Sequence, residues 1–229
     1  MNLLALETST RYLSVALWRD GELSERAEEI PNGGSERLLP WVNQLLAEAG
    51  MAVVDLEGIA FGAGPGGFVG LRLACGVAQG LAFGLDVPVL GVSSLAALAL
   101  ASHSGGNESI FACLDARMSE VYYGAYLVRD GVVETVVTEK VTSPQQVTLP
   151  PGGEWIGCGD GFGVYPELLL ADAIALRSGT WPTAAAVARL AAAQFARGDG
   201  LDAGLAYPMY VRDKVALTTA ERLARGGSK

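Results

Sequence analysis

The chain has 229 residues, of which half are hydrophobic and 18% are charged, a composition that excludes a disordered protein. The 25 acidic and 16 basic side chains give a net charge of -9, and such a field repels nucleic acid. Three well-separated cysteines, with no basic leader before Glu7, predict a cytoplasmic protein without disulfides.

The first thirty residues predict three strands. Two apolar strands are separated by a short polar turn, and Asp20-Gly21 is a hairpin signal before the third. Apolar periodicity and turn residues then predict, in order, a helix at about 35 to 49, a strand at 56 to 61, a glycine-rich loop, a helix at about 68 to 84, a strand at 87 to 91 and a helix from Ser93.

A similar passage returns at residues 110 to 140. The triplet Arg-Asp-Gly recurs 110 residues after its first occurrence, and Asp115 ends a strand 108 residues after Glu7 does. A strand at 154 to 158 and an Ala-rich helix closed by Gly198 follow, while the tail has no strong signal. We therefore predict an α/β fold of two duplicated lobes, residues 1–104 and 105–229, each a mixed sheet with flanking helices.

The stretch FGAGPGGFVG, residues 61 to 70, contains five glycines. It lacks the Lys-Ser/Thr ending that a P-loop uses to hold phosphate, and its glycines do not have the spacing of a dinucleotide fingerprint. The pattern favours close packing over phosphate binding.

The following helix carries a glycine every four residues, which places the three glycines on one stripe. Glycine in a helix costs about 1 kcal/mol relative to alanine, so three in register indicate close approach of another backbone. The rest of the helix has no polar face, so we expect it to be covered on all sides, by the sheet on one side and by the preceding helix or a partner on another. Gln79 and the glycines interrupt the apolar stretch, which we judge too short and too polar to span a membrane. Its predicted partner-binding residues are Arg72, Leu73, Gly76, Val77, Gly80, Phe83 and Gly84.

The preceding helix has an apolar stripe broader than packing on one sheet requires. An internal core explains this stripe as well as a protein interface does, and both interpretations stay open. The candidate partner-binding residues on this helix are Leu38, Leu39, Trp41, Val42, Leu45 and Leu46.

Polar turns at matching places in the two copies suggest a weak nucleotide site, consisting of Glu7, Thr8, Ser9 and Asp115. A Ser/Thr turn that bonds its own backbone, and an ion pair between Asp115 and Arg117, are the structural alternatives. Residues 157–161 either flank an adenine or form a turn. The single histidine, His103, supports neither a metal site nor a Ser-His-Asp site, so we expect no catalytic residue, metal or cofactor.

Several motifs together resemble the bacterial TsaB (YeaZ) family over nearly the whole chain: LxxETST, FGAGPGGFVGLRLACGVAQGLAFG, VPVLGVSSL, LDARMSEVYY and YPMYVR. The resemblance implies an ASKHA fold and a role in making N6-threonylcarbamoyladenosine at position 37 of tRNAs that read ANN codons. It implies a non-catalytic partner of the subunit TsaD, joined by the ATPase TsaE, that contacts tRNA only indirectly. It also implies a homodimer, formed through the same first-lobe helices.

Two departures bear on these expectations. The catalytic relative has an H-x-x-x-H metal motif, and the corresponding residues 32–38 contain no histidine. The family's GPGSFTG appears here with Gly67 and Val69 in place of both hydroxyls. The alternatives are a nucleotide-dependent phosphotransferase that uses Glu7 or Asp115 in the cleft, and a peptidase, against which the missing ligands argue.

Overall fold

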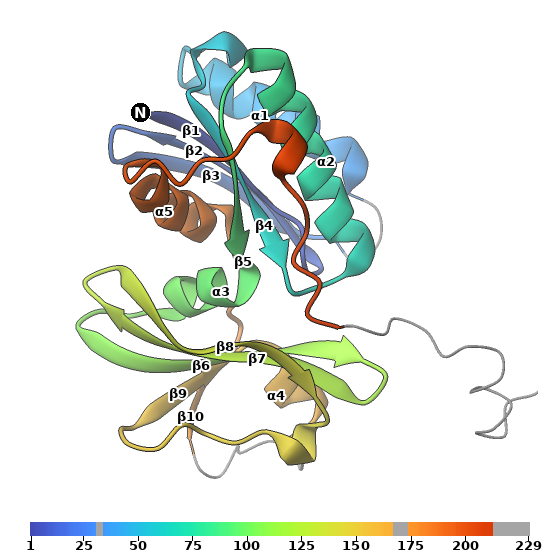
Figure 1. The fold of residues 1–229 in the computed structure, drawn as a ribbon, viewed down its shortest axis with the longest axis vertical. Helices are drawn as coiled ribbons and strands as arrows, with labels where there is room; N and C mark the ends of the chain where they lie inside the picture. The colour runs from blue at the N-terminus through green and yellow to red at the C-terminus, as the bar shows by residue number, and fades with distance from the viewer. Residues whose placement is uncertain (31–33, 167–173, 213–229) are drawn as a thin grey trace, which may run out of the picture.

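The computed structural model describes residues 1–30, 34–166 and 174–212. The chain forms two lobes, each built on a five-stranded mixed sheet (Figure 1). The tail after residue 212, and two residues of the stretch that corresponds to the metal motif, lie outside the described part.

The first sheet has the strand order β3-β2-β1-β4-β5. Its strands are β1 (Asn2–Glu7), β2 (Tyr12–Arg19), β3 (Glu22–Glu29), β4 (Gly58–Gly64) and β5 (Val89–Ser93). The first three form an antiparallel meander, and β4 and β5 run parallel to β1. Asp20 and Gly21 both have positive φ, which confirms the predicted hairpin turn.

The second sheet repeats this arrangement, with the order β10-β9-β6-β7-β8. Its strands are β6 (Asn107–Arg117), β7 (Glu120–Arg129), β8 (Val132–Thr142), β9 (Trp155–Cys158) and β10 (Ala175–Arg177). Read from β8, the order is that of the first sheet, so the predicted duplication is confirmed. The short edge strand β10 was not predicted.

The helices form layers on the sheets (Figure 1). Two of them, α1 (Ser35–Glu48) and α2 (Phe68–Leu85), cover the outer face of the first sheet. Between the sheets lie α3 (Ser94–Ser102) and α5 (Ala184–Phe195), while the short α4 (Gly161–Val164) packs on β6. The 3-10 turns are η1 (Val53–Asp55), η2 (Pro144–Gln146) and η3 (Ala203–Leu205).

The last helix of each copy packs on the sheet of the other lobe. Helix α5 lies on β1 and β2, and α3 lies on β6 and β7, so one continuous core joins both sheets. Ala184, Ala188 and Ala191 are fully buried, and their small side chains let α5 approach the first sheet closely. The expected division into 1–104 and 105–229 does not follow this packing, because α5, which falls in the second range, packs on the sheet of the first lobe.

Residues 199–212, which we call the strap, follow α5 and run beside α2 (Figure 1). Leu201 exchanges two backbone hydrogen bonds of 2.9 Å with Val89 on the edge of the first sheet. Farther along, the Met209 N–H donates to the carbonyl of Ala63 at 2.7 Å. The strap ends at Arg212, which contacts the second lobe.

Candidate functional site

A cleft of about 870 Å³ lies between the lobes. Its walls include residues 8–11 and 66–71 of the first lobe, 115–118 of the second lobe and 209–212 of the strap. Three of the predicted nucleotide-binding residues, Thr8, Ser9 and Asp115, therefore line one space. The structure does not place Glu7 in its walls.

Glu7 is fully buried at the end of β1. One carboxyl oxygen accepts the Ser9 N–H at 2.5 Å, and the other accepts the Ser94 hydroxyl at 3.0 Å. Burial raises the pKa of Glu7, because the low-dielectric interior disfavours the charged form. Since the carboxyl group is enclosed and already accepts two hydrogen bonds, the structure does not present Glu7 to the cleft as a ligand for a metal or nucleotide.

The glycine-rich loop packs directly on the turn after β1. A Cβ atom would lie 1.9 Å from the Glu7 carboxylate at Gly62 and 2.5 Å from the Ser9 carbonyl at Gly66. At Gly70 it would lie 1.8 Å from the Thr8 carbonyl. No side chain fits in these spaces, so the packing interpretation of the loop is confirmed.

Thr8 and Ser9 are almost completely buried by this packing. The Thr8 hydroxyl donates to the carbonyl of Gly70 at 2.7 Å, and the Ser9 carbonyl accepts the Gly67 N–H, also at 2.7 Å. The Thr8 hydroxyl and the Ser9 carbonyl thus hold the loop, whereas the buried Ser9 hydroxyl has no hydrogen-bond partner among the described residues.

In the second copy, Asp115 forms contacts within its own turn. Its carboxylate accepts hydrogen bonds from the Tyr165 hydroxyl at 3.0 Å and the Arg117 N–H at 2.9 Å. The Arg117 guanidinium lies 3.5 Å away in a solvent-exposed ion pair, which confirms the predicted pairing. Asp160 accepts the Asp115 N–H, and burial raises the pKa of Asp160.

The remaining polar candidates also have structural roles. Gly159 has a φ of +98° and lies against the carbonyl of Cys113, and the expected turn consists of Gly159 and Asp160, between the end of β9 and the start of α4. His103 is the C-cap residue of α3. Within residues 1–30, 34–166 and 174–212, no group of three or more His, Cys, Asp or Glu side chains could hold a metal ion.

The outward face of α2 is apolar and open. Gly76, Gly80 and Gly84 are exposed, and a Cβ atom added at any of them would meet nothing within 4 Å. Phe83 is 83% exposed and Val69 is 80% exposed. The described chain leaves the glycine stripe uncovered, so the sheet and α1 do not supply the whole of the expected cover for this helix.

By length and composition alone, α2 is long and apolar enough to span a membrane. The prediction that this stretch is too short and too polar to do so is therefore wrong. Its buried face, which includes Ala74, Ala78 and Ala82, packs against the sheet beside α1. In this structure α2 is a layer of the first lobe.

Helix α1 contributes less to the surface than its stripe suggested. Leu38, Val42, Leu45 and Leu46 are buried in the core of the first lobe. Their assignment as partner-binding residues is corrected: the internal-core interpretation holds for them, because one face of α1 is needed to cover the sheet.

Two predicted residues of α1 stay partly accessible. Leu39 is exposed and Trp41 is half-buried. Arg37, one turn before Trp41 on the same flank, pairs with Glu28 of β3. Trp41 therefore lies toward β3, and Leu39 lies on the opposite flank.

The strap packs on the flank of α2 that carries Arg72 and Gln79, and sequence analysis did not predict this contact. The Gln79 amide donates to the carbonyls of Ala203 at 3.2 Å and Ala206 at 2.9 Å. Arg72 donates to the Tyr210 hydroxyl at 3.2 Å and stacks on Phe68. The available signal was Gln79 itself, an uncharged polar side chain in an otherwise apolar helix.

Two sheets of identical strand order, joined by exchanged helices around a cleft, define a two-lobed protein of the actin-like ASKHA class. Within this class, the present chain has a turn after β1 that bonds the Glu7 carboxylate and the glycine-rich loop, and an α2 face that is open and apolar.

Comparison with known proteins shows which family within this class the chain resembles. The family model described as "TsaD: tRNA N6-adenosine threonylcarbamoyltransferase" matches residues 31–160. The chain is 37% identical to "tRNA threonylcarbamoyladenosine biosynthesis protein TsaB" of Escherichia coli (strain K12), covering 94% of this chain and 96% of that one. It is 34% identical to the protein of that name in Haemophilus influenzae, covering 94% and 95%.

A solved structure, "YeaZ from Pseudomonas aeruginosa", is 44% identical and superposes with a TM-score of 0.86, over 91% of this chain and 99% of that chain. The chain belongs to the TsaB family.

Proposed function

We propose that this chain acts in tRNA threonylcarbamoyladenosine biosynthesis as a non-catalytic subunit that binds a TsaD-type catalytic subunit. The observation that carries the proposal is the open α2 face with its glycine stripe. A TsaE-type ATPase completes the assembly, which acts in the cytoplasm on tRNAs that read ANN codons. In the absence of the catalytic subunit, the same face supports a homodimer.

The α2 face has the physical properties of a contact surface. Burying a large apolar side chain such as Phe83 is worth roughly 1.5–3 kcal/mol, and this side chain is mostly in water. Packed helices normally lie about 8–10 Å apart, depending on the side chains between them. At Gly76 and Gly80 no side chain intervenes, so a partner helix can approach to the short end of this range.

The cleft supports a non-catalytic role. Glu7 is enclosed, and the Asp115 carboxylate already bonds Tyr165 and Arg117. These acids are the groups on which the alternative function, a nucleotide-dependent phosphotransferase, depends. Calorimetric titration of the purified chain with ATP and Mg²⁺ distinguishes the two proposals: we expect no binding heat, and saturable heat would favour the phosphotransferase.

The decisive variant is Gly80→Leu, which places a large side chain in the middle of the stripe without touching the chain's own core. We expect the monomer to stay folded and to lose both co-purification with the TsaD-type subunit and tRNA modification. The matched control is Ala193→Leu, an exposed position on α5, which lies on the opposite face of the first sheet.

Reconstitution from purified components tests the role itself. Omitting this chain should abolish threonylcarbamoyladenosine formation on tRNA, and restoring it should recover the activity. Equal modification with and without the chain would contradict the proposal.

A further inference from the structure

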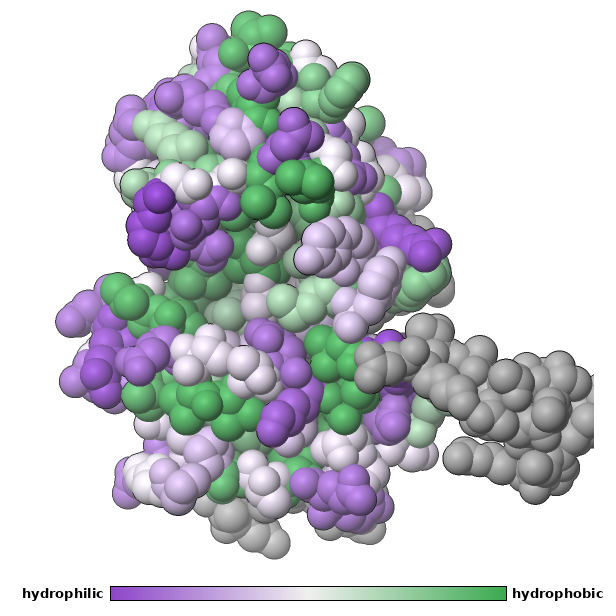
Figure 2. Space-filling model, viewed as in Figure 1, coloured by the Kyte–Doolittle hydropathy of each residue, from purple (hydrophilic) through white to green (hydrophobic). Residues whose placement is uncertain are grey.

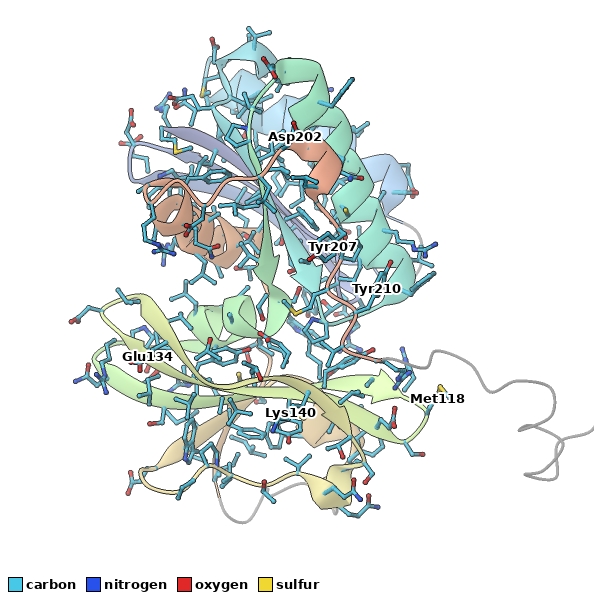
Figure 3. All side chains as sticks on the ribbon, viewed as in Figure 1. Met118, Glu134, Lys140, Asp202, Tyr207 and Tyr210 are labelled. Atoms are coloured by element: carbon cyan, nitrogen blue, oxygen red, sulfur yellow. The ribbon has the colours of Figure 1, made fainter. Side chains whose placement is uncertain are left out.

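The strap has four exposed apolar or aromatic side chains. Tyr207 is 75% exposed, Leu205 is 62% exposed, and Tyr210 and Leu201 are about half exposed. Figure 3 places Tyr207 and Tyr210 along the strap beside α2, and in Figure 2 this part of the surface is mixed, with green hydrophobic atoms beside pale purple ones. The described chain therefore leaves Leu205 and Tyr207 mostly in water.

The strap is held rigidly against α2. Two hydrogen bonds from Gln79 fix η3, and a third from Arg72 fixes Tyr210. The Cys75 thiol also contacts the Ala206 carbonyl, at 3.8 Å. Three positions on one flank of α2 thus position the strap, and its exposed side chains have a defined place relative to the helix.

The strap borders the glycine stripe directly. Arg72 lies four residues before Gly76 and eight before Gly80, so all three belong to one row along α2. Because Arg72 bonds Tyr210, a strap residue reaches the first position of that row. A helix seated on the stripe is about 10 Å wide and would therefore meet the strap on one side.

The family comparison indicates which occupant this arrangement suits. The TsaD-type model matches residues 31–160, a range that contains α1 and α2 but ends before the strap. A TsaD-type subunit therefore contains a related helix pair that can pack on the stripe, whereas the strap lies in a part of this chain that the match does not include.

We infer that the strap is part of the partner-binding surface, and that Leu205 and Tyr207 contact the TsaD-type subunit beside the helix that covers the stripe. The inference rests on the proposed function and extends the surface beyond the two helices. Tyrosine is suited to this place, because it offers a large contact area and loses little rotamer freedom on binding.

The test measures the affinity of the full-length chain for the purified TsaD-type subunit by titration calorimetry. Tyr207→Ala and Leu205→Ala, alone and combined, are compared with Val132→Ala, an apolar position 70% exposed on β8 of the second lobe. We expect the double variant to raise the dissociation constant about tenfold or more and the control to change it less than about twofold.

Two further measurements make the outcome decisive. Thermal melts of the isolated variants should match the parent chain, because both side chains are exposed. Gly80→Leu, measured in parallel, separates the inference from the proposed function. If Gly80→Leu abolishes binding while the strap variants bind like Val132→Ala, the strap inference is overturned and the function stands. If Gly80→Leu also binds normally, the proposed function fails.

Discussion

Thr8 and Gly70 are in direct contact across the first lobe. The Thr8 hydroxyl donates to the Gly70 carbonyl at 2.7 Å, and a Cβ atom at Gly70 would lie 1.8 Å from the Thr8 carbonyl oxygen. Ten residues farther along the same helix, a Cβ atom at Gly80 would meet nothing within 4 Å. Glycine is thus required at the start of α2 by the protein's own backbone, whereas at Gly80 the isolated chain does not require it.

This contrast predicts substitution effects of opposite sign. Gly70→Ala forces a side chain into backbone and should lower the free energy of unfolding by about 3 kcal/mol or more. Gly80→Ala should raise it by up to about 1 kcal/mol, because alanine is the better helix former. Urea titration of each variant, at a concentration low enough to keep the chain monomeric, measures both, and a destabilised Gly80→Ala would show that the stripe is not free.

The buried carboxyl group of Glu7 gives a second prediction. Glu7→Gln keeps the acceptor for the Ser9 N–H and offers an amide to the Ser94 hydroxyl, while it removes a charge that burial disfavours. The variant should fold, be at least as stable as the parent at neutral pH, and support tRNA modification in the reconstituted assembly. Urea titration and the modification assay measure these properties; a folded variant without activity would instead indicate a chemical role for Glu7.

The strands and helices of the first lobe could be predicted from the sequence because their signals are local. Alternating apolar residues, the Asp20-Gly21 turn and the 3.6-residue period each depend on near neighbours. The position of α5 could not be predicted. Its alanines indicate a buried helix, but nothing local shows that it packs on β1 and β2, more than 160 residues earlier.

The candidate site shows the same limit. A broad apolar stripe on α1 is compatible with burial against its own sheet or against another chain, and the structure assigns Leu38 and Leu45 to the core. An acid after a strand suggests a ligand site, but Glu7 is satisfied by Ser94, 87 residues away. The strap was missed because its contacts with α2 also join distant segments.

Arg212 gives a third prediction, since it joins the strap to the second lobe. Its guanidinium donates to the carbonyl of Ala116 at 2.9 Å and to the carboxylate of Glu120 at 2.6 Å. Arg212→Ala should therefore increase amide hydrogen exchange in the β6–β7 hairpin and leave exchange in the first sheet unchanged. Arg129→Ala, at an exposed arginine at the other end of β7, is the control. Unchanged exchange in the hairpin would show that Arg212 does not hold the lobes together.

The ion pair between Glu108 and Arg177 predicts how stability depends on pH. Both carboxyl oxygens of Glu108 accept from the guanidinium at 3.0 Å, and these bonds lower the pKa of Glu108 from 4.5 to about 2. A carboxyl group with a lower pKa in the folded state stabilises the fold fully above the unfolded value. This contribution should persist down to about pH 4.5 and disappear as the pH falls toward about 2.

Urea titrations between pH 7 and pH 3 measure this dependence. Glu108→Gln keeps the shape of the side chain but cannot ionise, so its unfolding free energy should fall less steeply below pH 4.5 than that of the parent chain. Glu134→Gln, at an exposed position on β8, should retain the parent's slope. The expected difference between the two chains arises because Glu108 takes up a proton on unfolding, which a glutamine cannot do. If the unfolding free energies of the parent and Glu108→Gln instead fall in parallel with pH, the ion pair does not contribute to the stability of the fold.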